Sequence, residues 1–214
     1  MFVKNWHRFG AVLLILIGGY LLLAKPAINQ VQFLLILNLL ALFAHQVEEY
    51  ELPGGAPLII NRVVYNETNL ADHYPGNSLS IMVVNVSAWF IYLIAIMLPS
   101  WHWLGLGVIL FSLFQILGHV FQMNIKLKTW YNPGMFTTIV LFLPLGIVFI
   151  HQLAQMNALN WSTWLFSVLT LLGCIITSII LPVQSMKNKD TKYVISPWQV
   201  NRYHQVVNFC KIKK

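Results

Sequence analysis

Six long apolar segments constrain the fold more than any other feature of this sequence. Each approaches the ~20 residues that an α-helix needs to cross the hydrocarbon core of a bilayer. Only 9% of the residues are charged and 58% are hydrophobic, whereas a water-soluble domain is about one quarter charged. The sequence therefore predicts an all-α integral membrane protein, a bundle of six transmembrane helices at residues 6–24, 28–49, 79–98, 101–123, 135–153 and 161–181.

The positions of Lys and Arg predict the orientation of this bundle. Basic residues beside apolar spans usually mark the cytoplasmic side of the membrane. If the N-terminus is cytoplasmic, all of the 13 Lys and Arg residues except Lys25 fall on the cytoplasmic side. We therefore expect both termini in the cytoplasm and a location in a bacterial inner membrane. Because topology accounts for the net charge of +7, we expect membrane lipid and no nucleic acid as a partner.

The regions outside the spans divide the chain. Residues 1–184 form the predicted transmembrane domain, and within it residues 52–78 are too polar to span and should form a structured cytoplasmic loop. Residues 185–214 form a basic cytoplasmic tail that also carries Trp198 and Phe209. This composition fits a segment lying on the membrane surface, and simple disorder is the alternative.

The acidic residues are the most informative feature for function. Of the 6 in the chain, all except Asp190 lie between Glu48 and Asp72. Glu48 and Glu49 end the second span, where a negative charge meets the negative end of the helix dipole at a cost of about 0.3–1 kcal/mol. At about 100° per residue, His45 projects from the same face as both carboxylates. The glutamates therefore need either compensating partners or a function.

Other spans carry polar residues at the same depth. Polar groups within the hydrocarbon region are costly unless they turn inward and meet partners. We therefore expect a common polar layer near the inner leaflet, which the second span shares with Asn85 of the third, Gln115, His119 and Gln122 of the fourth, and Thr137 and Thr138 of the fifth.

The run His45-Gln46-Val47-Glu48-Glu49 at the end of a span is followed by His119 in a later span and by an Asn-Pro-Gly turn at residues 132–134. In these residues the chain resembles the HXXEE-motif family of multi-helix membrane proteins. The resemblance covers the stretch from the second span to the fifth. Since that family is functionally uncharacterised, the resemblance implies a site but no reaction.

A divalent metal is the most specific interpretation of these residues. His45, Glu49 and His119 would supply three ligands and leave a fourth position for water, as in catalytic zinc sites. Glu48 would then be free to act as a general base. Zinc is favoured over iron or manganese, and the chemistry would be that of a metal-dependent hydrolase or isomerase.

A site at inner-leaflet depth suits a lipid or isoprenoid-type substrate whose reactive head group reaches it from the interface. Amide side chains could orient such a substrate or support the metal ligands, and cations could hold an anionic head group. The residues expected in these roles are Asn85, Asn132, Gln115, Gln122, Arg62 and Lys126.

The same residues permit other functions. His45 and a glutamate could act as acid and base without a metal. They could carry protons in a proton-coupled transporter, or line a ligand-binding bundle, since ionisable residues within membranes often mark such pathways. In a purely structural interpretation, the glutamates reach head-group water and the histidines bond to neighbouring helices. The sequence does not indicate an oligomeric state.

Overall fold

The structure, a computed structural model, describes residues 2–212. It contains six helices long and apolar enough to cross a membrane, as the sequence predicts. Among the described residues there is no β-strand. Lys213 and Lys214 of the predicted tail lie outside the described residues. The six helices are Trp6–Ala24, Gln30–Tyr50, Ser78–Met97, His102–Leu127, Met135–Gln155 and Trp161–Met186.

The first three spans are single helices, and each of the last three contains a π-helical turn. The single helices are α1 (Trp6–Ala24), α2 (Gln30–Tyr50) and α4 (Ser78–Met97). The fourth span consists of α5 (His102–Ile116), η3 (Leu117–Met123) and α6 (Asn124–Leu127). The fifth consists of α7 (Met135–Thr137), η4 (Thr138–Phe142) and α8 (Leu143–Gln155), and the sixth of α9 (Trp161–Cys174), η5 (Ile175–Ile180) and α10 (Leu181–Met186).

Two spans run further than the sequence predicts. The fourth continues to Leu127 and ends where Lys128 adopts a left-handed conformation, with φ of 53°. The sixth continues through Pro182, which lies in the first turn of α10 directly after η5. Proline has no N–H group to donate to an earlier carbonyl of the span, and it directly follows a π-helical turn, where the regular α-helical bonding pattern is already interrupted.

Side-chain caps fix the beginnings of several helices. Asn29 accepts a hydrogen bond from the Gln32 N–H at the start of α2, and Asn160 does the same for Thr163 at the start of α9. Asn77 forms a capping box with Ser80 at the start of α4. Such caps satisfy N–H groups that the helix itself leaves unpaired.

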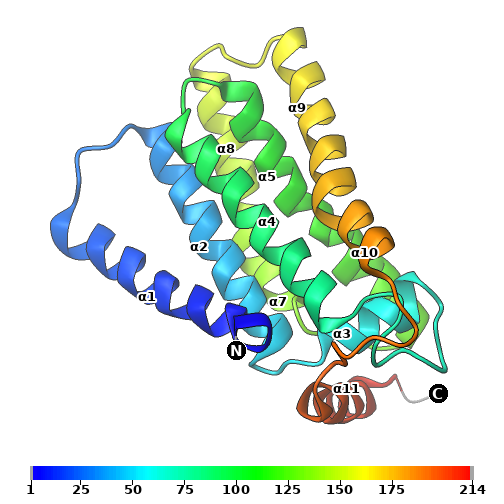
Figure 1. The fold of residues 1–214 in the computed structure, drawn as a ribbon. Coiled ribbons are helices and arrows are strands. Elements are labelled where there is room, and N and C mark those ends of the chain that lie inside the picture. Colours follow the sequence, from blue (N-terminus) through cyan, green and yellow to red (C-terminus); the bar gives the residue numbers. More distant parts are fainter. Residues whose placement is uncertain (1, 213–214) are drawn as a thin grey trace.

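Helix α2 is the centre of the bundle. It packs against α1, α4, α5 and α8, and most of its apolar side chains are buried. Helix α1 is peripheral and inclines away from α2 toward its C-terminal end (Figure 1). Only Trp6, His7 and Gly10 of α1 are buried, whereas Leu23 is 88% exposed. So small a number of buried residues suits a helix that faces lipid along most of its length.

We call the end of the bundle where α2 finishes the motif end. The described chain begins and ends there (Figure 1), as expected for an even number of spans. The loop after α2 contains α3 (Ala56–Ile59) and η2 (Ile60–Val64). Its return path is held by Asn61, whose side-chain amide donates to the Ala71 and Gly76 carbonyls. The loop is therefore structured, as predicted.

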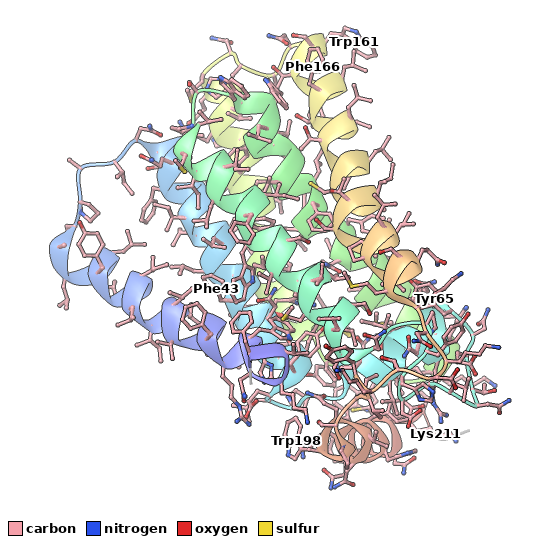
Figure 2. The ribbon with its side chains drawn as sticks, viewed as in Figure 1. Phe43, Tyr65, Trp161, Phe166, Trp198 and Lys211 are labelled. Carbon is pink, nitrogen blue, oxygen red and sulfur yellow. The ribbon has the colours of Figure 1, made fainter. Side chains whose placement is uncertain are left out.

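The tail also folds onto the motif end. Residues Pro197–Cys210 form helix α11, so disorder does not describe this part of the tail. Gln199 of α11 donates to the Tyr50 carbonyl and accepts from the Gly55 N–H, which pairs the last carbonyl of α2 with a side chain. Figure 2 shows Trp198 at the motif end and Trp161 at the opposite end of the bundle. Exposed tryptophans at both ends are typical of membrane interfaces.

The link between α1 and α2 yields a prediction about pH. Glu51 bonds to the guanidinium of Arg8 and to His7. Partial burial raises the pKa of Glu51, but the bonds from Arg8 and His7 outweigh burial, so the pKa lies below its ordinary value of 4.5. A lowered pKa means that the ion pair stabilises the fold above pH 4.5 and that this contribution disappears as the pH falls through the lowered pKa.

We therefore expect Glu51→Gln to reduce the free energy of unfolding of the purified protein at neutral pH by about 0.2–1 kcal/mol, as measured by thermal unfolding. The difference from the wild type should vanish in acid. Arg8→Gln should cost a similar amount, and the double variant should cost less than the two losses added together. Strictly additive losses would mean that this contact does not hold α1.

Candidate metal centre

Two histidines and one glutamate converge in the interior, toward the motif end. His45 and Glu49 lie one helical turn apart on α2, and His119 lies in η3 of the fourth span. One potential ligand atom from each of the three residues lies within 4.8 Å of the others. The three residues are 2%, 6% and 1% exposed, and the two imidazole rings are 5.0 Å apart at 89°. The structure therefore brings together the three residues that the sequence nominates as ligands.

The hydrogen bonds of His45 fix which of its ring nitrogens carries the proton. Nδ1 lies 2.9 Å from Thr137 Oγ1, and this hydroxyl lies 2.5 Å from a carboxylate oxygen of Glu48. A hydroxyl has one proton, and an ionised carboxylate can only accept. Thr137 therefore donates to Glu48 and accepts from His45 Nδ1. His45 Nε2 keeps its lone pair, which is buried without a hydrogen-bond partner among the described residues.

His119 is held in the same tautomer by Asn132. Its Nδ1 lies 2.7 Å from Asn132 Oδ1. The amide nitrogen of Asn132 donates to the His119 carbonyl at 2.7 Å and to Asn124 Oδ1 at 2.8 Å, which sets the orientation of the amide group. Because Oδ1 can only accept, His119 Nδ1 donates, and Nε2 carries the lone pair when the imidazole is neutral.

Both free lone pairs point at the same carboxylate. Glu49 Oε2 lies 3.7 Å from His45 Nε2, and Glu49 Oε1 lies 3.5 Å from His119 Nε2. Buried acceptors that face one another without a donor are unfavourable, and a shared cation removes the conflict. These two spacings fit a shared zinc ion, since ligands about 2.0–2.1 Å from a tetrahedral zinc ion lie about 3.4 Å apart; the ligand atoms of the three residues all lie within 4.8 Å of one another. Histidines whose other ring nitrogen is held by a partner are also typical of metal sites.

Glu48 lies outside this group, and its carboxylate is already engaged. Besides the Thr137 hydroxyl, it accepts from the backbone N–H groups of Phe136 and Thr137 at 3.0 and 2.8 Å. These groups belong to the first turn of the fifth span, where the helix dipole favours an anion. The fourth donor is the Tyr131 hydroxyl, at 2.8 Å; burial and the Glu48 charge raise the pKa of Tyr131. The carboxylate expected as a free base thus orients His45 through Thr137.

The Asn-Pro-Gly turn packs against the ring of His119. Gly134 has a φ of +100°, in the left-handed region of backbone conformation that favours glycine. A Cβ at this position would clash with His119 Cε1, so the ring can occupy its place in the centre only if residue 134 has no side chain. The Gly134 carbonyl accepts from the Thr138 hydroxyl at 2.7 Å, which ties the turn to the fifth span.

A cavity of about 390 Å³ adjoins the centre and is lined by Glu49 and His119. Three residues predicted to bind substrate, Asn85, Gln115 and Gln122, also line it. The polar atoms of Asn85 are committed, because its oxygen accepts from Gln46 and its nitrogen donates to Tyr50. The glutamines are therefore the better candidates for substrate contacts.

The remaining predicted substrate residues do not line this cavity. Asn132 supports His119 instead. The guanidinium of Arg62 lies over the Tyr203 ring, 5.2 Å from its centroid. Lys126 donates to the Val63 carbonyl and to Asn66. Both cations stabilise the folded loop and tail at the motif end, so the structure does not bring them to the site.

Sequence reasoning missed two supporting residues. Tyr131 reaches Glu48, and its only sequence signal is its position beside the Asn-Pro-Gly turn. Gln46, inside the motif, accepts from Trp89 at 2.8 Å and donates to Asn85 at 3.1 Å, which locks α2 against α4. A buried amide within an apolar span is the signal that could have identified Gln46.

Comparison with known proteins agrees with the motif. A family described as "Protein of unknown function with HXXEE motif" matches residues 36–149. This range includes all three converging residues, Glu48 and the Asn-Pro-Gly turn. No curated protein and no solved structure matches the chain.

The contact between Gly134 and His119 generates a prediction. We expect Gly134→Ala to lower stability by roughly 2–4 kcal/mol, because the new methyl group combines backbone strain with displacement of a buried ring. Thermal unfolding in detergent measures the loss. Gly173→Ala is the matched control, since its Cβ meets nothing within 4 Å and helix propensity favours alanine. Equal melting temperatures for the two variants would refute the proposed packing role.

Proposed function

Because this chain belongs to the HXXEE-motif family, whose function is unknown, we propose its activity from the site itself: a membrane-embedded, metal-dependent hydrolase of a lipid substrate. His45, Glu49 and His119 hold a divalent cation, preferably zinc given the mixed nitrogen and oxygen ligands. We further propose that the motif end faces the cytoplasm, in agreement with the distribution of Lys and Arg.

One observation carries this proposal: the Nε2 atoms of two imidazoles, each with its Nδ1 bonded to another side chain, lie 3.7 and 3.5 Å from one buried carboxylate. Hydrogen bonds to Thr137 and Asn132 prevent either ring from turning its N–H toward Glu49 without losing a partner. A protonated imidazole paired with Glu49 would satisfy one ring and leave the other lone pair unpaired. A cation satisfies both rings and the carboxylate together.

A catalytic role is favoured over a purely structural metal site. Structural zinc sites have four protein ligands, whereas catalytic sites have three and leave one position open. Among the described residues, no further His, Cys, Asp or Glu joins the three. Glu49 and His119 line a cavity together with Gln115, so a substrate in this cavity would have access to a cation that these residues hold.

The residues around the centre then have distinct tasks. The bound cation would supply an activated water for hydrolysis. Glu48 and Thr137 orient His45, while Asn132 and Gly134 place His119. Gln115 is positioned to contact the substrate within the cavity. The surrounding apolar helices exclude bulk water, which strengthens the electrostatic interactions of the centre.

Metal analysis tests the proposal directly. Purified wild-type protein should hold about one zinc equivalent per chain after dialysis. His119→Gln and Glu49→Gln should lose it, whereas His151→Gln and Glu67→Gln, whose side chains lie outside the centre, should retain it. Since a ligand that binds only the folded state stabilises that state, chelation should lower the wild-type melting temperature by roughly 5–10 °C and leave His119→Gln unchanged.

The other outcomes are equally informative. A wild-type protein that neither binds zinc, iron or manganese nor responds to chelation would remove the metal-dependent enzyme. Acid–base chemistry without a metal would then remain, as would proton-coupled transport. A proton flux in proteoliposomes that Glu49→Gln abolishes would select transport.

A further inference from the structure

The cavity beside the centre has a wall that faces lipid. It lies between α4, the fourth span and the sixth span, and η2 of the motif-end loop covers it. Tyr65, which follows η2, and Val183 of α10 both line it, and Figure 2 shows Tyr65 at the motif end. We call this space the lateral cavity. Much of its lining is apolar, including Ile81, Val84, Phe114, Ile175, Ile179 and Val183.

The polar groups of the lateral cavity are almost all uncharged. Besides Glu49 and His119, they are the hydroxyls of Tyr50 and Tyr65 and carboxamides from several elements. Gln122 and Gln184 are exposed at its rim, whereas Glu49 and His119 are nearly fully buried at its base. The carboxamides belong to Asn61, Asn85, Gln115, Gln122 and Gln184.

No Lys or Arg is among the residues described as lining the lateral cavity. Arg62 and Lys126 make other contacts. Lys187 donates to Gln184 at the rim but does not itself line the space. Proteins that bind phosphate or carboxylate head groups normally supply Arg or Lys. A second anion buried beside Glu49 without such a partner would be strongly disfavoured.

The outer surface of the fourth and sixth spans is apolar and exposed beside the lateral cavity. Phe121 of η3 and Ile176 of η5 are about half exposed, at 53% and 48%. Gly118 lies in η3 and lines the cavity, and a Cβ at Gly118 would meet nothing within 4 Å. Glycine therefore leaves a gap in the wall at the fourth span where a longer side chain would project.

From these features we infer that the lateral cavity takes a single-chain lipid with an uncharged, hydrogen-bonding head group, which arrives from the bilayer between the fourth and sixth spans. The carboxamides of Gln115 and Gln122 and the hydroxyl of Tyr65 bind the head group, and the apolar wall binds the chain. The inference deepens the proposed function by naming its substrate class. Binding itself requires no metal, so the two can fail separately.

Photocrosslinking tests the head-group preference. The probes are a 1-O-alkylglycerol and its 3-phosphate, with the same diazirine-bearing chain, in phosphatidylcholine vesicles that contain the full-length protein and EDTA. The ether bond resists hydrolysis, and EDTA removes any contribution of metal to phosphate binding. We expect the neutral probe to label η3 and η5 at least about tenfold more than its phosphate does.

A matched pair of glycine variants tests the route. Gly118→Leu should fill the gap and reduce labelling by the neutral probe severalfold. Gly173→Leu is the control, because Gly173 also has open space around its Cβ but does not line the cavity. It should label like the wild type. Neither substitution meets a neighbouring atom within 4 Å at Cβ, so both proteins should fold.

Three results would overturn the inference: equal labelling by both probes, phosphate labelling that Lys187→Gln removes, or neutral-probe labelling that Gly118→Leu leaves intact. Selective neutral labelling in a protein without bound metal would support the cavity assignment and refute only the metal-dependent enzyme. Bound zinc without head-group selectivity would support the metal centre and refute only the cavity assignment.

Discussion

The burial of two adjacent carboxylates at the end of α2 is the constraint on which the site depends. Glu48 and Glu49 are each only 6% exposed, and an ionised carboxylate away from water requires partners. The two side chains find their partners in different parts of the structure. Glu48 accepts hydrogen bonds from backbone N–H groups in the first turn of the fifth span, and Glu49 faces the imidazoles of His45 and His119. The packing of the second, fourth and fifth spans thus follows from satisfying two neighbouring charges.

The six apolar helices and the convergence of His45, Glu49 and His119 could be predicted because their signals are local. Six apolar segments follow from the solvent that the helices must meet, and the shared face of His45 and Glu49 follows from helical periodicity. The place of His119 beside them could be predicted because it is a polar residue at a comparable depth in another span. Each inference needs only the spacing along one helix and the cost of polar groups in lipid.

The roles of the supporting residues could not be predicted, because they depend on contacts across the chain. Glu48 shares a helix face with His45, yet its role is set by backbone N–H groups of Phe136 and Thr137, 88 and 89 positions away. Arg62 was expected at a head group, but helix α11 places Tyr203 beneath it. No pattern in the sequence states which loop folds over which helix end.

The charge of the centre agrees with an uncharged substrate. With both histidines neutral, a divalent cation held by His45, Glu49 and His119 would be balanced by the charges of Glu49 and of Glu48, which is linked to His45 through Thr137. The two carboxylates would then leave no net positive charge at the base of the lateral cavity to attract an anionic head group. An uncharged head group would also leave the open position of the proposed metal to water, which agrees with a described lining that contains carboxamides but no Lys or Arg.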